Sequence, residues 1–199
     1  MMDVPLPIPG PREILIKVSV CGVCHTELDE IEGRLPPDLP VVPGHEIVGR
    51  VERAGAGAEK FREGTRVGVA WIHSACGTCQ FCREGNENLC SQFKGTGCHA
   101  NGGYAQYTTV PEDFAYPIPD RFSDAEAAPL LCAGAIGYRD MKLSGVKRGD
   151  TLGLFGFGAS AHIVIQIARH WRCEVFAFTR SEEHQVLARQ LGASWAGKP

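Results

Sequence analysis

The chain has 199 residues, of which 44% are hydrophobic, and its formal net charge is −3 from 20 basic and 23 acidic side chains. This length suits one large or two small domains with a sizeable core. Positive and negative charges are interleaved without a basic stripe, which excludes the usual footprint of nucleic-acid binding. The longest apolar stretch, residues 152–168, includes three glycines, a histidine and a glutamine, so we expect no membrane span.

Residues up to about 119 have the pattern of short β-strands. The segments Glu13–Val20 and Glu46–Ala54 alternate apolar and polar residues, and Val67–Trp71 and Tyr104–Val110 are further short candidates. Many short strands separated by glycine- and proline-containing turns predict a small barrel or sandwich.

The pattern changes after Pro119. Ser123 and Glu126 have the spacing of a capping box, which predicts a helical stretch over residues 125–143 with an interruption near Pro129. A turn over residues 145–150 should follow this stretch. We assign residues 1–149 to a first domain, which includes a connecting helical segment at 123–144, and residues 150–199 to a second.

The second domain reads as alternating strands and helices. A buried strand is expected at 151–155, a glycine-opened helix at 156–170, an apolar strand at 173–178 and an amphipathic helix at 181–191. Ser181 is the expected N-cap of the last helix and Gly192 its C-cap. The order β-α-β-α predicts the opening of a doubly wound parallel sheet, so the fold class is α+β followed by α/β.

The most specific feature of the sequence is a cluster of four cysteines in one short loop with the spacing Cys-x2-Cys-x2-Cys-x7-Cys. They are Cys76, Cys79, Cys82 and Cys90. Four thiolates converging at one point favour a tetrahedral structural zinc. Gly77 and Gly85 allow the tight turns that such a loop needs.

Two alternatives to zinc stay open at this point. An iron–sulfur cluster is one, although the bacterial pattern has three residues before its last cysteine, whereas seven precede Cys90 here. Disulfides are the other. The N-terminal segment lacks the basic and apolar regions of a signal peptide, so we expect a cytoplasmic protein in a reducing compartment, where clustered cysteines bind metals or do redox chemistry.

A second set of metal-ligand residue types is spread along the chain. His45 and Glu46 lie in the string VVPGHEIVG, Cys24 lies upstream and Cys132 downstream. Taken singly, each is more often a packing or satisfied polar residue. Together they match the Cys₂His ligand set of a catalytic zinc with an open fourth position. Spacings of 21 and 87 residues do not establish that the three ligands meet.

A glycine-rich turn follows the strand at 151–155. Gly156, Gly158 and Ala161 fit G-x-G-x-x-G/A, in which the first glycine makes the tight turn and the second lets the backbone approach a pyrophosphate. The alternative is a glycine turn used only for packing. At the end of the next strand, Thr179 stands where an acid would bind the ribose of NAD, and Arg180 follows, so the pattern favours NADP. Glu182 and Glu183 come directly after; they either belong to an ordinary charged helix start or weaken this preference, and the sequence leaves both alternatives open.

These strings jointly resemble the zinc-dependent alcohol dehydrogenases of the medium-chain dehydrogenase/reductase family. The matching strings are CGVCHTELDEIEG, VVPGHEIVGRV, WIHSACGTCQFC, GGYAQYTTV, PLLCAGAIGY and GFGASA. They cover nearly the whole chain. The resemblance implies a GroES-like β-barrel catalytic domain followed by a Rossmann domain, one catalytic and one structural zinc, and a nicotinamide cofactor.

The resemblance also implies roles for single residues. Cys24, His45 and Cys132 match the catalytic zinc ligands, and Glu46 matches the acid beside the metal. Cys76, Cys79, Cys82 and Cys90 match the ligands of the structural zinc. Thr26 matches the hydroxyl that takes the proton of the alcohol, and Trp71 matches a bulky residue lining the substrate pocket.

Two departures from the family pattern stand out. Asp29 occupies the position of a histidine that completes a proton relay in many relatives, so the relay is expected to end differently. The sequence also shows two strands of a nucleotide-binding sheet that has about six. The chain thus resembles the front portion of an enzyme.

The implied reaction is reversible oxidation of an alcohol to an aldehyde or ketone with NAD(P), and the full-length protein is expected to form a homo-oligomer. The rival interpretations are an NADPH-dependent aldehyde reductase of the cinnamyl-alcohol-dehydrogenase type and a zinc-binding fragment without turnover.

Overall fold

The computed structural model describes residues 3–199, which form two compact units, the first ending at Cys132 and the second spanning Ala133–Pro199. The expected boundary at 149/150 differs from this division, because the helix over residues 133–144 belongs to the second unit rather than to the first. The functional assignment of residues 1–149 and 150–199 stays a prediction. Within residues 3–199, no helix combines the length and the apolar character needed to cross a bilayer.

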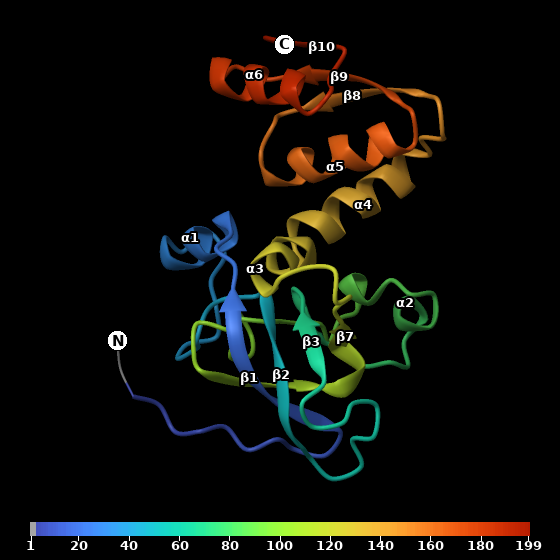
Figure 1. Ribbon diagram of the computed structural model, residues 1–199. Coiled ribbons are helices and arrows are strands. Elements are labelled where there is room, and N and C mark those ends of the chain that lie inside the picture. The colour runs from blue at the N-terminus through green and yellow to red at the C-terminus, as the bar shows by residue number, and fades with distance from the viewer. Residues whose placement is uncertain (1–2) are drawn as a thin grey trace. The chain divides into compact units, whose positions relative to one another are not determined.

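The first unit is built on a five-stranded antiparallel sheet in the order β6-β1-β2-β3-β7 (Figure 1). Its strands are β1 (Glu13–Cys21), β2 (Ile47–Ala54), β3 (Arg66–Val69), β6 (Tyr107–Pro111) and β7 (Ala115–Pro117). A separate antiparallel pair consists of β4 (Ile72–Ser74) and β5 (Lys94–Gly95). The sheet confirms the predicted β-structure, although the candidate strand at 67–71 breaks after Val69.

Aliphatic side chains from neighbouring strands form the core of this sheet. The fully buried members include Ile14, Ile16, Ile47, Val67 and Val110. Strand β1 departs from simple alternation, because Leu15 is also buried and the register with β2 shifts between Leu15 and Ile16. Both faces of β1 are therefore covered at this point.

Short helices interrupt the first unit. They are α1 (His25–Ile31), α2 (Gln80–Arg83) and α3 (Asp124–Ala127), with 3₁₀ turns η1 (Glu87–Leu89), η2 (Glu112–Phe114) and η3 (Ala128–Leu131). Ser123 and Glu126 form the predicted capping box of α3, and Pro129 lies in the first turn of η3, so the expected interruption is confirmed. Helix α1 had no counterpart among the sequence predictions.

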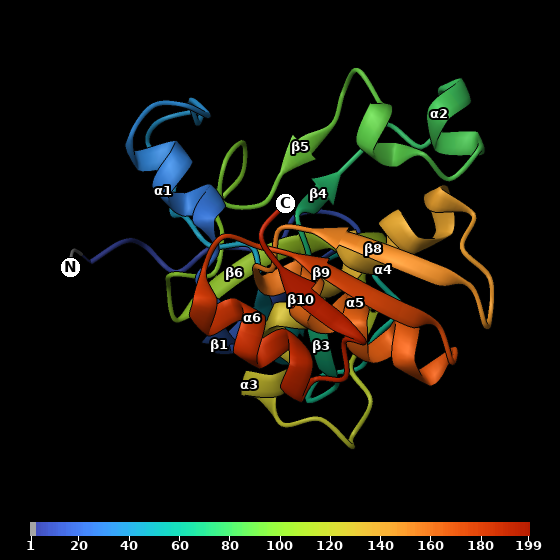
Figure 2. The same cartoon turned by 90° about the horizontal axis from the view of Figure 1, so that it is seen from above.

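The second unit contains a parallel sheet in the order β10-β9-β8, whose strands lie side by side in Figure 2. Its elements are α4 (Ala133–Ser144), β8 (Thr151–Phe155), α5 (Ala159–His170), β9 (Glu174–Phe178), α6 (Glu182–Gln190) and β10 (Trp195–Gly197). The sequence predicted two strands, and the short β10 adds a third. Helix α4 approaches α5 closely, because a side chain at Gly137 would collide with Val164.

One face of this parallel sheet is buried and the other is not. Val175, Ala177 and Ala196 pack in one core with residues of α5 and α6. Phe155 on the opposite face is 78% exposed and stacks on Phe178 at a centroid distance of 4.4 Å. The prediction of a buried strand at 151–155 is therefore wrong for one face, because nothing in this unit covers it.

The caps of helix α6 are nearly as expected. Ser181 is the N-cap, and its hydroxyl accepts a hydrogen bond from the backbone N–H of His184. The predicted C-cap, Gly192, is wrong by one residue: Leu191 is the C-cap, and Gly192 follows it with a φ of 101°. Glycine suits this left-handed conformation because it has no Cβ to clash.

Candidate metal centres and nucleotide-binding turn

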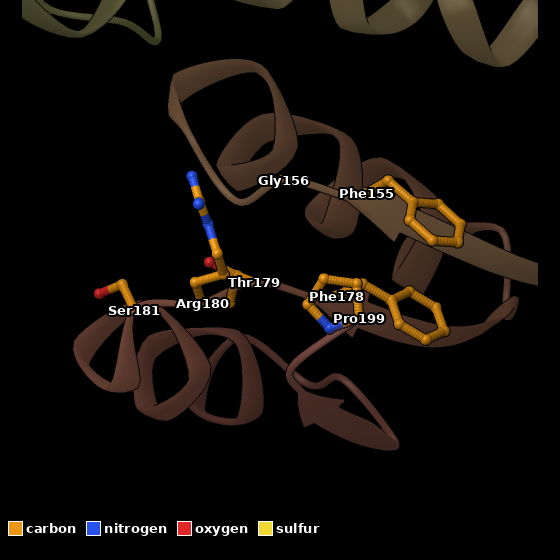
Figure 3. A pocket seen from close by; sticks show the side chains of 7 residues that line it. All are labelled: Phe155, Gly156, Phe178, Thr179, Arg180, Ser181 and Pro199. Carbon is orange, nitrogen blue, oxygen red and sulfur yellow. The ribbon is translucent and has the colours of Figure 1, made fainter.

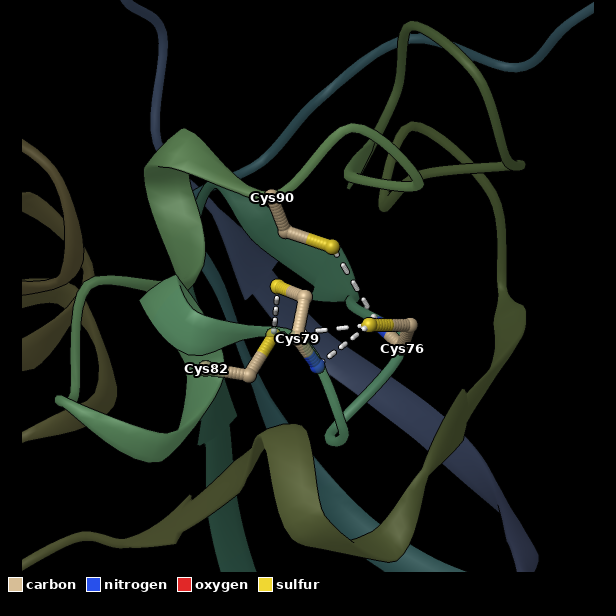
Figure 4. Close-up of side chains that lie close together, drawn as sticks. All are labelled: Cys76, Cys79, Cys82 and Cys90. Atoms are coloured by element: carbon tan, nitrogen blue, oxygen red, sulfur yellow. Dashed lines mark hydrogen bonds between the residues drawn. The ribbon is translucent and has the colours of Figure 1, made fainter.

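The four sulfur atoms of the cysteine lobe point toward one another, as Figure 4 shows. The members are Cys76, Cys79, Cys82 and Cys90, and their sulfur atoms all lie within 4.8 Å of one another. The Cys76–Cys82 separation is 3.9 Å and the Cys79–Cys82 separation is 3.5 Å. Two sulfurs bound to one tetrahedral zinc at about 2.3 Å lie about 3.8 Å apart, whereas a disulfide needs about 2.05 Å. The spacing therefore fits a shared metal ion.

Backbone N–H groups of the lobe donate to its sulfurs. Cys79 donates to Cys76 Sγ at 3.3 Å, and Gln92 donates to Cys90 Sγ at 3.3 Å. Hydrogen bonds from the backbone of Thr78 and Cys79 lower the pKa of Cys76 to about 6. Desolvation and the neighbouring sulfurs raise the pKa of Cys82 to about 12. The Cys76 thiolate therefore forms readily, whereas ionisation of Cys82 is favoured only when a cation lies nearby.

The second ligand set also converges, although its members come from three distant segments of the first unit. Cys24 is the N-cap of α1, His45 and Glu46 precede β2, and Cys132 follows η3. One ligand atom from each lies within 4.8 Å of every other. Cys24 Sγ and Cys132 Sγ are 3.8 Å apart, the separation expected of two zinc-bound sulfurs.

A carboxylate that sequence reasoning missed fixes the imidazole of His45. Glu27 Oε1 lies 2.7 Å from His45 Nδ1, with side-chain exposures of 4% and 1%. Glu27 Oε2 accepts a hydrogen bond from the backbone N–H of Cys24. Burial disfavours the charged form of both groups. The hydrogen bond and charge attraction between Glu27 and His45 outweigh this effect, so the pKa of Glu27 is lowered and the pKa of His45 is raised. With Nδ1 engaged, Nε2 is the nitrogen left for a metal.

The remaining predicted residues of this site lie around the ligands. Thr26 Oγ1 is 3.5 Å from Cys24 Sγ. Glu46 is 5% exposed, and its pKa is raised by burial. Gly22 leaves room for it, because a Cβ there would lie 1.9 Å from the Glu46 carboxylate. The Trp71 indole packs edge-to-face with His45 at a centroid distance of 5.2 Å.

A glycine-rich loop holds the backbone that presents His45. A Cβ at Gly97 would lie 2.7 Å from the backbone N of Gly44, and one at Gly102 would lie 2.1 Å from the Gly44 carbonyl. The backbone N–H groups of Gly102 and Gly103 donate to the carbonyls of Val42 and Gly44. The close approach of the two backbones requires glycine.

Asp29, which replaces the relay histidine of many relatives, faces other charged groups. Arg34 Nε donates to its Oδ1 at 2.6 Å, and His25 Nε2 lies 3.8 Å from the same oxygen. All three side chains are at least one-third exposed. Asp29 is thus part of a surface ion-pair group.

The predicted nucleotide-binding residues gather in the second unit. A cavity of about 410 Å³ is lined by Gly156, Thr179 and Arg180, with Ser181, Phe155, Phe178 and Pro199 completing the wall (Figure 3). Gly156 has a φ of 87°, as a tight turn needs, and a Cβ at Gly158 would meet open space. Ala161 lines a second cavity of about 280 Å³. The exposed backbone at Gly158, which is the N-cap of α5, fits the approach of a phosphate.

Comparison with known proteins agrees with these features. The family model of the alcohol dehydrogenase GroES-like domain matches residues 10–120. The probable alcohol dehydrogenase AdhA of Mycobacterium tuberculosis is 48% identical over 197 residues, which cover 96% of this chain and 57% of that protein. The chain therefore spans little more than half of this relative's length.

Solved structures give the same result. A cinnamyl alcohol dehydrogenase from Sorghum bicolor superposes with a TM-score of 0.90 at 34% identity, covering 98% of this chain and 59% of that one. The cinnamyl alcohol dehydrogenase of Helicobacter pylori in complex with NADP(H) gives 0.89 at 30% identity, covering 95% and 57%. The chain belongs to the alcohol dehydrogenase GroES-like domain family, among the medium-chain dehydrogenases/reductases.

Proposed function

We propose that this chain provides the metal centres and the start of the cofactor site of a zinc-dependent alcohol dehydrogenase. The reaction is the reversible oxidation of an alcohol to an aldehyde or ketone with NAD(P). The observation that carries the proposal is the convergence of Cys24, His45 and Cys132, with Glu46 alongside, from three separate segments. A Cys₂His set leaves a fourth position open, which is typical of catalytic rather than structural zinc.

Each residue near this set has a proposed task. Cys24, His45 and Cys132 would hold the catalytic zinc, which when bound acts as a Lewis acid that lowers the pKa of an alcohol. The Thr26 hydroxyl, 3.5 Å from Cys24 Sγ, accepts the proton of the substrate hydroxyl. Trp71 lines the substrate pocket beside His45.

The four-cysteine lobe has a separate, structural task. A zinc held there by Cys76, Cys79, Cys82 and Cys90 has no open position. The metal would fix a loop whose only regular elements are α2 and η1. Two zinc ions per chain are therefore proposed, one catalytic and one structural.

The cofactor is proposed to be NADP in preference to NAD. Gly156, Gly158 and Ala161 would receive the pyrophosphate at the start of α5. Thr179 and the exposed Arg180 border the cavity at the end of β9, and a guanidinium there suits the 2′-phosphate. Among residues 3–199, no aspartate or glutamate side chain lines this cavity, so none is placed there to bind a free ribose hydroxyl.

An NADPH-dependent aldehyde reductase is the second candidate. It is favoured by the likeness to cinnamyl alcohol dehydrogenases, one of which was solved with NADP(H). The two candidates share the site and differ in physiological direction. A cytoplasmic location, homo-oligomer formation and the lack of nucleic-acid partners stay predictions from the sequence.

The test is a metal analysis combined with an activity screen on a panel of alcohols and aldehydes, read by the absorbance of the reduced cofactor. Because the chain spans 57% of its relative's length, it is assayed beside a version extended to that length. Turnover in the extended version that disappears in Cys24→Ala supports the proposal. Turnover that survives this substitution contradicts it, and two zinc ions without turnover in either version favour a zinc-binding fragment.

A further inference from the structure

Tyr104 connects the two segments of the first unit that carry Cys24 and His45. It lies in the stretch between β5 and β6 and is 42% exposed. Its backbone N–H donates a hydrogen bond to the carbonyl of Pro43 at 2.9 Å, which fastens this stretch to the residues that precede His45. The side chain reaches both segments, one through its ring and the other through its hydroxyl.

The ring of Tyr104 packs against the residue directly before His45. A Cβ at Gly44 would lie 2.6 Å from Cδ1 and 2.9 Å from Cε1 of the ring, and 2.8 Å from the sulfur atom of Cys21. Gly44 also has a φ of 99°, a left-handed conformation that favours glycine. The ring and the thiol therefore both lie directly on the Gly44 backbone and limit how the peptide leading into His45 can move.

The hydroxyl of Tyr104 fixes the segment that leads to Cys24. Its Oη donates a hydrogen bond to the carbonyl oxygen of Gly22 at 3.2 Å. The backbone N–H of Gly22 in turn donates to the carbonyl of Glu46 at 2.9 Å. Gly22 is thus held through both of its backbone polar groups, two residues before Cys24.

These contacts lie where the sheet no longer holds the two segments together. The antiparallel pairing of β1 with β2 runs as far as Cys21 and Ile47. Cys24 and His45 lie beyond this last pair, so the ladder does not by itself set the distance between them. Tyr104 belongs to a third segment and contacts both of the others, so it supplies a further restraint.

We propose that Tyr104 is a positioning residue for the catalytic metal: its hydroxyl restrains the segment of Cys24 and its ring restrains the segment of His45, so that both ligands stay at one point. In this role it acts through the backbone of Gly22 and Gly44 and is not itself a ligand. The inference rests on the proposed function, because it presupposes a catalytic metal at this Cys₂His site.

Loss of the Tyr104 side chain should affect the metal more than the fold. The residue is partly exposed, and the buried cluster of the antiparallel sheet, within the described part of the first unit, consists of other side chains. A group that orients metal ligands typically contributes about 10- to 100-fold in metal affinity. We therefore expect a selective loss of affinity at the Cys₂His site.

The experiment measures the metal affinity of each site in the full chain, without requiring turnover. The chain is loaded with Co²⁺, and titration with a chelator of known cobalt affinity, followed through the cobalt absorption spectrum, gives one dissociation constant for each site. Cys24→Ala identifies the spectrum of the Cys₂His site, because it removes a ligand there and leaves the cysteine lobe intact. Tyr104→Ala should weaken cobalt binding at the Cys₂His site about tenfold or more and change the affinity of the cysteine lobe by less than about twofold.

Two further variants separate positioning from general destabilisation. Tyr104→Phe keeps the ring on Gly44 and removes only the hydroxyl, so it should weaken the Cys₂His site by a smaller factor, about two- to tenfold. Because this variant removes a single oxygen atom, its result decides the matter if Tyr104→Ala does not fold. Tyr116→Phe is the matched control: Tyr116 is a tyrosine of the first unit with a similar exposure of 44%, and the change should leave both affinities unaltered.

The outcomes distinguish this inference from the proposed function. A Tyr104→Phe chain that binds cobalt at the Cys₂His site as tightly as the unaltered chain, while Cys24→Ala abolishes that binding, overturns the inference and leaves the catalytic metal intact. Equal weakening of both metal sites by Tyr104→Ala also overturns it, because the tyrosine would then support the fold in general. A cobalt spectrum unchanged by Cys24→Ala contradicts the proposed metal site and the inference with it.

Discussion

Glu27 and His45 form a contact of 2.7 Å between Oε1 and Nδ1 in a part of the first unit that is closed to water. Neither atom has another hydrogen-bond partner among residues 3–199. A carboxylate in this place sets the tautomer and the orientation of a metal-binding imidazole.

Glu27→Gln should therefore weaken metal binding at the second site. Loss of such a partner typically reduces affinity about 10- to 100-fold. Competition with a chelator of known zinc affinity measures the effect. Glu32→Gln is the control, because Glu32 is an exposed carboxylate at the end of the same helix. An affinity unchanged by Glu27→Gln would show that the contact does not support the metal.

Cys79→Ser should remove the zinc of the cysteine lobe and leave the other site loaded. The zinc content falls from two ions to one, and the loop becomes sensitive to proteases, since its short elements have little packing of their own. Mass spectrometry under native conditions and limited proteolysis provide the readouts. Cys173→Ala, which alters a buried thiol outside both clusters, should keep both ions. Two ions retained in Cys79→Ser would contradict the assignment.

Arg180→Ala should weaken binding of NADPH about tenfold or more and leave NADH almost unaffected, because hydrogen bonds to charged groups contribute about 1.5–3 kcal/mol. Thr179→Asp should shift the preference toward NADH. Quenching of tryptophan fluorescence measures both affinities. Arg148→Ala, an exposed arginine of the same unit, is the matched control. Equal weakening of both cofactors by Arg180→Ala would argue against a 2′-phosphate contact.

Asp124 makes the stability of the first unit depend on pH. Its carboxylate accepts hydrogen bonds from the Ser19 hydroxyl and from Arg66 Nε, and these lower the pKa of Asp124. The stabilisation is complete above the ordinary pKa of an aspartate and is lost as pH falls through the lowered value.

Asp124→Asn should therefore destabilise the unit by about 1 kcal/mol at pH 7, since the pair is partly exposed. The difference from the unaltered chain should shrink at pH 3. Urea unfolding at the two values measures it, with Asp120→Asn as the control for an exposed aspartate. A difference in unfolding free energy that grows on acidification would contradict a lowered pKa of Asp124 in the folded chain.

The two metal centres differ in how far the sequence alone could predict them. The cysteine lobe is local, so its spacing is enough to suggest a zinc. Cys24, His45 and Cys132 are far apart in sequence, so their residue types suggested a Cys₂His set but could not establish that the three residues meet. Glu27 went unnoticed because helix α1 was not recognised: it buries Glu27 and Glu30 while Leu28 and Ile31 are exposed, the reverse of an amphipathic pattern.

In the second unit, the pattern of apolar residues did not predict the exposed face of β8 or the existence of β10. Strand β8 reads as buried because Leu152 and Leu154 do pack against the helices, whereas Phe155 on the other face is exposed. Strand β10 has three residues, too few for a periodic signal.

Zinc content in the unaltered chain and in Cys24→Ala is the sharpest test of the proposed catalytic site, because it counts the metal where the chemistry is proposed. We expect two ions in the unaltered chain and one in Cys24→Ala, with the fold of the first unit retained as measured by circular dichroism. A single ion in the unaltered chain, or two ions that persist in Cys24→Ala, would contradict a metal held by Cys24, His45 and Cys132.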